Sequence, residues 1–322
     1  MINPPRLKFA ALPTPVEQVP RLTQVLGGPR ILVKRDDLTG LGLGGNKTRK
    51  LEFLLAEAAA NGARTLITTG AVQSNHCRQT AAAAALMGFD CILVLAGDQP
   101  PQLSGNLLLD HIFGAEIIWT TRAQRDATLK ATFDQAWEQG RRPYLVPYGG
   151  SNPTGAAAYA FAIQELMLQT SGIDWIVFAS SSGGTQAGMV TGAKLFGFPG
   201  KILGISVDEP EQALRAHVAE LASATADLLG ETQRFSASDI LVNAEYCQAG
   251  YGVLGDAEKE AIRLFARYSG LLLDPVYTGR AAAGLIDLIR QGFFKPGETL
   301  LFWHTGGAPA IFADLYRDLV SD

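Results

Sequence analysis

Cysteine is scarce in this sequence of 322 residues: Cys77, Cys91 and Cys247 are widely spaced, and no CxxC pair occurs. That pattern argues against a disulfide framework or a cysteine-based zinc site, and it is typical of a reducing compartment. Also missing are a run of about 18 apolar residues, which a membrane-spanning helix needs, and an apolar signal core at the N-terminus. We therefore expect a cytoplasmic protein that does not bind a membrane.

An excess of charge of either sign is absent as well. The chain has 27 lysines and arginines against 31 aspartates and glutamates, which gives a net charge of −4. No basic field is available to hold nucleic acid or anionic lipid. The content of 47% hydrophobic and 18% charged residues is ordinary for a globular protein, and the length suits two compact domains.

Short apolar runs alternate along the chain with longer helical patterns. The predicted strands are Ile31–Lys34, Thr65–Thr69, Cys91–Leu95, Ala115–Trp119, Pro143–Val146, Trp175–Ala179, Ile202–Val207 and Thr299–His304. The predicted helices are Thr48–Ala60, Cys77–Met87, Gly105–Phe113, Ala123–Glu138, Gly155–Leu168, Gln186–Phe196, Asp256–Tyr268 and Gly279–Arg290. Strands separated by helices of this length predict an α/β fold, with mostly parallel sheets covered by helices.

Four connections between these elements are rich in glycine, serine, threonine and asparagine. Such residues let the backbone approach a ligand and supply neutral hydrogen bonds. Ligand sites in open α/β sheets lie beyond the carboxyl ends of the strands. We expect the chemistry in Gly42–Asn46, Gly70–His76, Ser180–Thr185 and His304–Pro309.

The segment Ser180–Thr185 joins a predicted buried strand to a predicted helix. A glycine-rich turn at a helix start exposes N–H groups, and the helix dipole adds about half a positive charge, so a phosphate group could bind there. The segment matches neither GxGxxG nor GxxxxGK[ST], which disfavours a dinucleotide site and a P-loop. An ordinary connection with serine or threonine as the helix cap is the alternative, and the sequence leaves both open.

Lys47 stands at the start of a predicted helix, after Asn46 as a possible cap, and Arg49 and Lys50 follow in the same turn. Cations at this end oppose the helix dipole by about 0.3–1 kcal/mol each. Crowding and partial burial lower the pKa of an amine, as a Schiff-base nucleophile requires. Alternatively, the basic turn faces solvent or pairs with carboxylates. The carboxylates available are Asp36, Asp37 and Glu52.

The segment Gly44–Glu52 reads GGNKTRKLE. Further distinctive segments are Lys34–Leu38, Gln73–His76, Gly149–Gly155, Gly250–Gly252, Asp274–Gly279 and His304–Pro309. Together they resemble the D-cysteine desulfhydrase and 1-aminocyclopropane-1-carboxylate (ACC) deaminase family, in that family's order. The resemblance runs from about Leu12 to Phe312, which is nearly the whole chain.

The resemblance implies the tryptophan-synthase-β-like fold (fold type II), with pyridoxal 5'-phosphate bound between two domains. Residues 44–152 correspond to a small α/β domain inserted into a large cofactor-binding domain of residues 1–43 and 153–322. The family also implies a homodimer.

The resemblance also assigns roles to residues. Lys47 corresponds to the Schiff-base lysine, Asn75 to the partner of the cofactor's phenolic oxygen, and Ser74 to the residue that holds the substrate carboxylate or assists proton transfer. The phosphate loop corresponds to Ser182, Gly183, Gly184 and Thr185. Asn75 could instead cap the following helix. His76 and His304 show no metal-ligand or triad spacing, and we predict that they are structural and that the protein has no metal site.

Two active-site tyrosines of the family correspond to Tyr251 and Tyr277, although either could be a structural aromatic residue. Family members with ACC deaminase activity resemble one another in carrying glutamate after the second tyrosine and leucine after the last histidine motif. This sequence has Thr278 and Thr305 there, predicted to contact the cofactor. Neutral threonine near the pyridine nitrogen should hold it less firmly protonated, which a good leaving group such as sulfide tolerates.

We therefore expect α,β-elimination of a small amino-acid substrate, D-cysteine, to pyruvate, ammonia and sulfide. ACC deamination and L-cysteate sulfo-lyase activity remain alternatives, because the short connection Ala96–Gly105 bears on substrate preference. A nicotinamide-dependent oxidoreductase would need the GxGxxG turn that is absent. A non-catalytic amino-acid-binding protein would be expected to lose Lys47 or the tyrosines, all of which are present.

Overall fold

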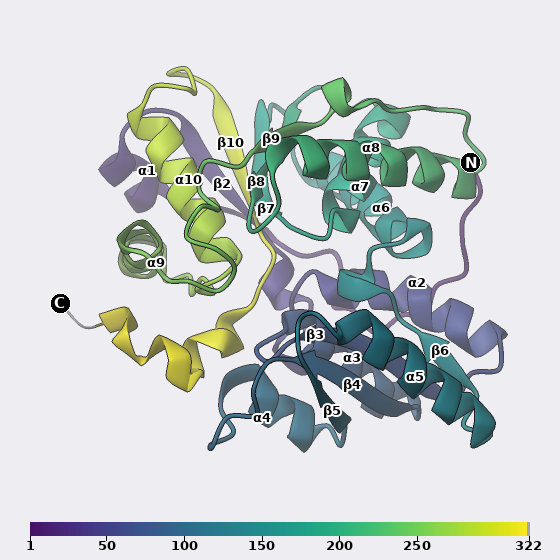
Figure 1. The fold of residues 1–322 in the computed structure, drawn as a ribbon. Helices are drawn as coiled ribbons and strands as arrows, with labels where there is room; N and C mark the ends of the chain where they lie inside the picture. Colours follow the sequence, from purple (N-terminus) through teal and green to yellow (C-terminus); the bar gives the residue numbers. More distant parts are fainter. Residues whose placement is uncertain (321–322) are drawn as a thin grey trace.

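Two sheets organise residues 1–320, the part of the chain that the structure, a computed structural model, describes (Figure 1). The larger sheet has the strand order β1-β2-β10-β7-β8-β9. Its strands are β1 (Val16–Gln18), β2 (Arg30–Arg35), β10 (Thr299–His304), β7 (Trp175–Ser180), β8 (Lys201–Ser206) and β9 (Leu241–Asn243). All neighbouring strands pair in parallel except β1, which runs antiparallel to β2 at the edge.

The smaller sheet is entirely parallel and has the order β5-β4-β3-β6. Its strands are β3 (Thr65–Ala71), β4 (Asp90–Ala96), β5 (Glu116–Thr120) and β6 (Pro143–Leu145). The chain leaves the larger sheet after β2, builds the smaller sheet, and returns at β7. This path supports our proposal that residues 44–152 are a small domain inserted into a large one.

Strand β10 illustrates why the central strands read as continuous apolar runs. Leu300 and Phe302 point to one face of the sheet, where they join the hydrophobic core with Phe265. Leu301 and Trp303 point to the other face, which has a core of its own. Because both faces are covered by helices, both sets of side chains must be apolar.

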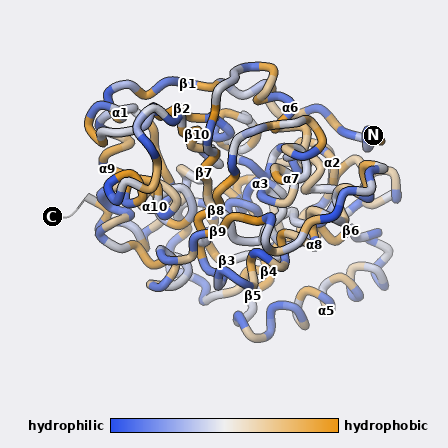
Figure 2. The backbone as a smooth tube through the Cα atoms, turned by 90° about the horizontal axis from the view of Figure 1, so that it is seen from above, coloured by the Kyte–Doolittle hydropathy of each residue, from blue (hydrophilic) through white to orange (hydrophobic). Residues whose placement is uncertain are grey.

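Helices cover each sheet on both sides. Around the larger sheet lie α1 (Pro20–Leu26), α6 (Pro153–Gln169), α7 (Gly184–Phe196), α8 (Glu211–Leu228), α9 (Asp256–Ser269) and α10 (Thr278–Arg290). Around the smaller one lie α2 (Lys47–Ala60), α3 (Asn75–Met87), α4 (Gly105–Ile112) and α5 (Arg125–Glu138). Figure 2 shows hydrophobic colouring along central strands such as β7, whereas α5 at the periphery alternates between the two colours.

The expected α/β class is confirmed, and each predicted strand and helix is present with its ends within two residues of the prediction. Among the strands and α-helices of residues 1–320, four were not predicted: β1, α1, β9 and the long helix α8. The first three are short and lie at sheet edges. The spacing of Leu214, Val218, Leu221 and Thr225, all buried on one face of α8, was a usable helical signal. Within residues 1–320, no helix combines the length and apolar character that crossing a membrane requires.

Candidate active site

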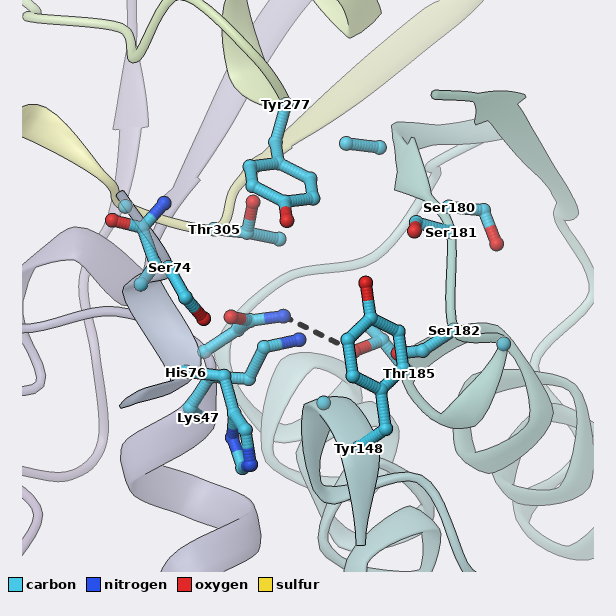
Figure 3. Close-up of a pocket in the computed structure, with 16 residues that line it drawn as sticks. Lys47, Ser74, His76, Tyr148, Ser180, Ser181, Ser182, Thr185, Tyr277 and Thr305 are labelled. Carbon is cyan, nitrogen blue, oxygen red and sulfur yellow. Dashed lines mark hydrogen bonds between the residues drawn. The ribbon is translucent and has the colours of Figure 1, made fainter. Parts of the chain in front are cut away.

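A partly open cavity lies between the two sheets, with about 630 Å³ of space free of protein atoms, open solvent included. All four segments that the sequence singled out contribute to its wall (Figure 3). The predicted site residues that line it are Lys47, Ser74, Asn75, Ser182, Gly183, Thr185, Tyr277 and Thr305. The first and last of these residues are more than 250 positions apart in the sequence, and the fold brings them together around one cavity.

Lys47 is the first residue of α2, and its amine lies at the cavity wall. No hydrogen bond or ion pair of this amine is recorded among residues 1–320. Burial lowers the pKa of Lys47 to about 8. About a tenth of the amine is therefore unprotonated at pH 7, far more than for a lysine of ordinary pKa, and a nucleophilic lysine requires the unprotonated form.

The other two cations of this turn are accounted for by partners. Arg49 forms an ion pair with Asp36 at 2.8 Å, one of the pairings the sequence left open. Lys50 is fully buried and donates to the carbonyl of Gly149 at 3.1 Å. The interpretation of a solvent-facing basic turn is therefore wrong. Asn46 stands at the N-cap position of α2 as expected, but its side chain does not cap the helix, and its amide instead donates to Thr185 Oγ1 at 3.1 Å.

Asp36 is the centre of a buried network that includes Arg49 in the first turn of α2. Its carboxylate accepts hydrogen bonds from Arg49, from the Tyr159 hydroxyl at 2.6 Å and from the Trp303 indole at 2.8 Å. Burial raises the pKa of Asp36, but the charge and hydrogen bonds of Arg49 outweigh it and hold the pKa below its ordinary value. Because Arg49 shares a helical turn with Lys47, this network fixes the position of that turn.

The serine-glycine turn leads from β7 into α7. The N-cap of α7 is Gly183, whose φ of 76° is in the left-handed region, and no side chain caps the helix. The alternative interpretation of the serines and threonine as helix caps is therefore wrong. The first N–H groups of a helix have no intrahelical partner. The Gly184 N–H donates to Ser151 Oγ, and within residues 1–320 no side chain caps the N–H groups that follow it in the first turn. The turn can bind a phosphate group in this geometry.

A second loop supports this turn from behind. Ser151 Oγ lies 2.8 Å from Ser182 Oγ and accepts from the Gly184 N–H at 3.2 Å. Lys50 Nζ lies 3.3 Å from Ser151 Oγ, so a buried amine, whose pKa burial lowers well below its ordinary value, is one hydroxyl away from the turn. A Cβ atom on Gly184 would lie 2.5 Å from Ser151 Oγ, which explains the glycine.

Gly183→Ala should weaken pyridoxal phosphate binding by about tenfold, or about 1.4 kcal/mol. The added Cβ would lie 2.9 Å from His217 Cδ2, and the residue would keep a strained positive φ. The turn would then have to shift. The dissociation constant of the cofactor, from an absorbance titration of the cofactor-free variant, measures the effect.

Gly197→Ala is the matched control, because Gly197 is at the other end of α7 with a φ of 74° and open space around it. Both variants should lose about 1 kcal/mol of folding stability through the strained backbone. Equal cofactor affinity in the two variants would show that the turn does not hold the phosphate.

Ser74 and Asn75 begin α3 at the opposite wall. Ser74 is the N-cap, and its Oγ accepts from the Cys77 N–H at 3.1 Å. The alternative role of Asn75 as that cap is therefore wrong. Asn75 Oδ1 accepts from Asn106 Nδ2 at 2.9 Å, which orients its amide group at the cavity wall. The start of this helix can therefore present a hydroxyl and an amide to a carboxylate or a phenolic oxygen.

Tyr251 and Tyr277 form a pair, with their hydroxyl groups 2.6 Å apart and their rings edge to face. Tyr277 lines the cavity, and Tyr251 lies behind it. Burial raises the pKa of both well above the ordinary value, so both remain protonated at neutral pH. Asp274 positions Tyr277 by accepting from its N–H at 3.0 Å.

The predicted threonine contacts differ in placement. Thr305 lines the cavity. Thr278 is fully buried at the start of α10, and its hydroxyl donates to Asp274 Oδ1 at 2.8 Å, so it is not part of the cavity wall. Gly184 likewise contributes to the turn without lining the cavity. A sequence position next to a cavity residue does not show which way a side chain points.

The two histidines have structural contacts. Burial, followed by the charges of Lys47 and Lys50, lowers the pKa of His76 well below its ordinary value, so it is neutral. Its Nε2 lies 2.9 Å from Thr68 Oγ1. His304 Nδ1 accepts from the Gly306 N–H at 3.2 Å. Both placements agree with the prediction that these histidines support the site.

Sequence reasoning assigned no role to Tyr148, which also lines the cavity, and it included Ser180 and Ser181, which do so too, only as part of the serine-glycine segment Ser180–Thr185. Ser180 Oγ is buried and has no hydrogen-bond partner among residues 1–320. A ligand would provide the missing partner. The Lys47 amine is unpaired on one side of the cavity, and the first turn of α7 offers backbone N–H groups on the other side. The residues present therefore fit pyridoxal phosphate.

Comparisons with known proteins also bear on whether the site binds pyridoxal phosphate. Over residues 7–306 the sequence matches the family described as pyridoxal-phosphate dependent enzyme. A solved protein described as an ACC deaminase homologue is 37% identical, with 98% of this chain and 97% of that chain covered and a TM-score of 0.89.

Two more distant solved structures share the fold. A hydrogen sulfide-producing enzyme from Fusobacterium nucleatum is 16% identical, covering 92% of this chain and 95% of that one, with a TM-score of 0.64. The processed form of threonine deaminase isoform 2 from Solanum lycopersicum is 15% identical, covering 92% and 80%, with a TM-score of 0.65. The expected fold type is confirmed.

Proposed function

The chain belongs to the pyridoxal-phosphate dependent enzyme family, and on that premise we propose that it is a D-cysteine desulfhydrase. The reaction consumes D-cysteine and water and releases pyruvate, ammonia and hydrogen sulfide. The observation that supports a catalytic site most strongly is that Lys47 lines the same cavity as Gly183 and Thr185 at the start of α7.

In this proposal Lys47 binds the cofactor covalently, and the turn formed by Ser182, Gly183, Gly184 and Thr185 holds its phosphate. When bound, pyridoxal phosphate withdraws electrons from the substrate carbon that carries the amino group. The freed Lys47 amine takes the proton from that carbon. Its lowered pKa of about 8 suits this exchange near neutral pH.

The remaining residues bind and orient. Ser74 Oγ and the α3 N-terminus hold the substrate carboxylate, and Asn75 donates to the phenolic oxygen of the cofactor. Tyr277, supported by Tyr251, supplies a protonated hydroxyl group beside the substrate. The burial of these groups excludes bulk water, which would otherwise weaken each hydrogen bond.

D-cysteine is favoured over ACC by the neutrality of the cavity wall. No aspartate or glutamate lines the cavity within residues 1–320, and Thr305 contributes a neutral hydroxyl group. Such a wall does little to keep the pyridine nitrogen protonated. Expulsion of sulfide tolerates that weakness, whereas opening of a cyclopropane ring has no comparable leaving group.

ACC deamination is the second candidate, because a solved relative at 37% identity is described as an ACC deaminase homologue. Cysteate sulfo-lyase activity is a third candidate, and the same experiment tests it. Purified protein saturated with pyridoxal phosphate should release sulfide and pyruvate from D-cysteine at a higher kcat/KM than it releases ammonia from ACC or sulfite from L-cysteate. Faster turnover of ACC would overturn the choice of substrate, and cofactor binding without any turnover would favour the non-catalytic alternative.

The pH dependence of cofactor uptake should reflect the lowered pKa of Lys47. The unprotonated fraction of an amine with a pKa of about 8 rises tenfold per pH unit below that value and levels off above it. The rate of uptake, followed by stopped-flow absorbance, should be divided by the rate for Nα-acetyl-lysine, whose amine has an ordinary pKa. This ratio should fall above about pH 8. A constant ratio would contradict a lowered pKa.

We also propose that the protein is a homodimer, as the family resemblance implies. Light scattering coupled to size-exclusion chromatography would give a mass near twice 34.3 kDa. A mass of one chain would exclude it.

A further inference from the structure

Tyr148 separates two neighbouring cavities. It lines the active-site cavity and also an outer cavity on its far side. Ser181 and Ser182 are the other residues that line both. The ring of Tyr148 is 37% exposed, so it stands at the boundary and is not part of a core. A substrate group that extends outward from the inner cavity would meet this ring.

The position of Tyr148 is held from two sides. It begins a short 3₁₀ turn, Tyr148–Gly150, whose Gly149 carbonyl accepts from Lys50. A Cβ atom on Gly149 would lie 2.2 Å from Ser182 Oγ, so this turn is pressed against the serine-glycine turn. On the outer side, the Arg125 guanidinium lies 5.0 Å from the centre of the Tyr148 ring. These contacts make the ring a fixed wall and not a mobile surface side chain.

The hydroxyl group of Tyr148 faces the inner cavity. Figure 3 shows Tyr148 and Tyr277 entering from opposite sides with their hydroxyl groups directed inward. No hydrogen-bond partner of the Tyr148 hydroxyl is recorded within residues 1–320. Burial and the nearby Asp208 raise the pKa of Tyr148, so the group remains a proton donor at neutral pH.

The inner cavity has few side chains that could neutralise a second anionic group on the substrate, in addition to its carboxylate. Of the residues that line it, Lys47 and His76 are the ones that could carry a positive charge. In the proposed function Lys47 is bound to the cofactor, and the pKa of His76 is far too low for protonation at neutral pH. Arg122 and Arg125 line the outer cavity, and the Tyr148 ring separates that cavity from the inner one. A sulfonate or carboxylate held at the β-position within the inner cavity would therefore lose its hydration without a charged side chain in contact, which is unfavourable.

We propose that Tyr148 is a specificity-determining residue that restricts the substrate to amino acids with a small, uncharged β-substituent. The ring limits length, and the neutral hydroxyl groups around it disfavour charge. This inference deepens the proposed function and rests on it. A thiol fits these limits, whereas a sulfonate or an extended thioether does not.

The test uses amino acids that cannot undergo elimination, so that binding is measured apart from turnover. The cofactor-loaded protein is titrated by calorimetry with alanine, 2-aminobutyrate and norvaline, in both enantiomers. The wild type should bind less tightly as the side chain lengthens. In Tyr148→Ala the affinity for norvaline relative to alanine should rise about tenfold, as expected for removal of a steric limit. Tyr148→Phe, which keeps the ring, should show the same ratio of norvaline affinity to alanine affinity as the wild type.

Trp137→Ala is the control, because Trp137 is an exposed aromatic residue on α5 that lines neither cavity. If Tyr148→Ala does not fold, Tyr148→Leu removes the ring with less loss of volume. A norvaline-to-alanine ratio unchanged by either variant would overturn the inference, as would wild-type binding of aspartate, which has a charged β-substituent that cannot be eliminated, as tight as that of 2-aminobutyrate. Failure of the wild type to form pyruvate from D-cysteine would refute the proposed function while leaving this binding ratio measurable.

Discussion

Replacement of Lys47 by alanine should reduce turnover of D-cysteine by at least about 1,000-fold, because it removes both the attachment point of the cofactor and the proton-transferring amine. The variant should also fail to show the visible absorbance of lysine-bound pyridoxal phosphate. Steady-state assays of pyruvate formation and an absorbance spectrum measure the two effects. Replacement of Lys194, an exposed lysine of α7, provides the control and should leave both unchanged.

Lys47→Ala should leave the stability of the fold unchanged or raise it, although it lowers activity. The unfolded chain holds the Lys47 proton with an ordinary pKa, whereas folding lowers that pKa to about 8. Folding therefore costs free energy at neutral pH through this group, and the cost is absent in Lys47→Ala. The cofactor-free variant should unfold at the same or a higher denaturant concentration than the cofactor-free wild type. A loss of stability would indicate a structural role for Lys47.

Asp36→Asn should lower the free energy of unfolding by about 3 kcal/mol, the lower end of the range for breaking a buried ion pair, because Glu165 remains paired with Arg49. Asp36 is fully buried, and the substitution removes the other of the two carboxylates that pair with the buried Arg49 guanidinium. Urea denaturation at neutral pH measures the loss. The same variant should bind pyridoxal phosphate more weakly, because Arg49 and Lys47 lie in one helical turn.

The direction in which the stability loss of Asp36→Asn changes with pH follows from the low pKa of Asp36 in the folded protein. The carboxylate stabilises the fold above its ordinary unfolded-state pKa, and this contribution is lost as the pH falls through the lower folded-state pKa. The difference between wild type and variant should therefore shrink in acid. Glu260→Gln, which removes an exposed ion pair with Arg290, should cost no more than about 1 kcal/mol. Equal losses in the two variants would refute the role of the buried network.

Much of the fold could be predicted because its signals are local. Buried parallel strands must be apolar on both faces, so segments such as Trp175–Ala179 stand out from the helices between them. Glycine-rich connections at the ends of these strands then indicate where a ligand could bind. The importance of Lys47 could be inferred from an electrostatic conflict, since three cations crowd a helix start that disfavours them.

What could not be predicted depends on contacts between distant residues. Arg49 is neutralised by Asp36 and by Glu165, which is 116 positions away, and no local pattern reveals that pairing. Thr278 follows a cavity residue in sequence, but its hydroxyl group turns to Asp274 instead. Tyr148 precedes two glycines that matched the family pattern, yet only the packing of three segments shows that its ring closes the cavity.

Borohydride reduction of the cofactor-loaded protein, followed by peptide mass spectrometry, tests the central claim most directly. Reduction converts a lysine-bound pyridoxal phosphate into a stable secondary amine. The account predicts one modified peptide, with the added mass on Lys47. Modification of Lys50 or of any other lysine in its place, or loss of all cofactor from the reduced and denatured protein, would contradict it.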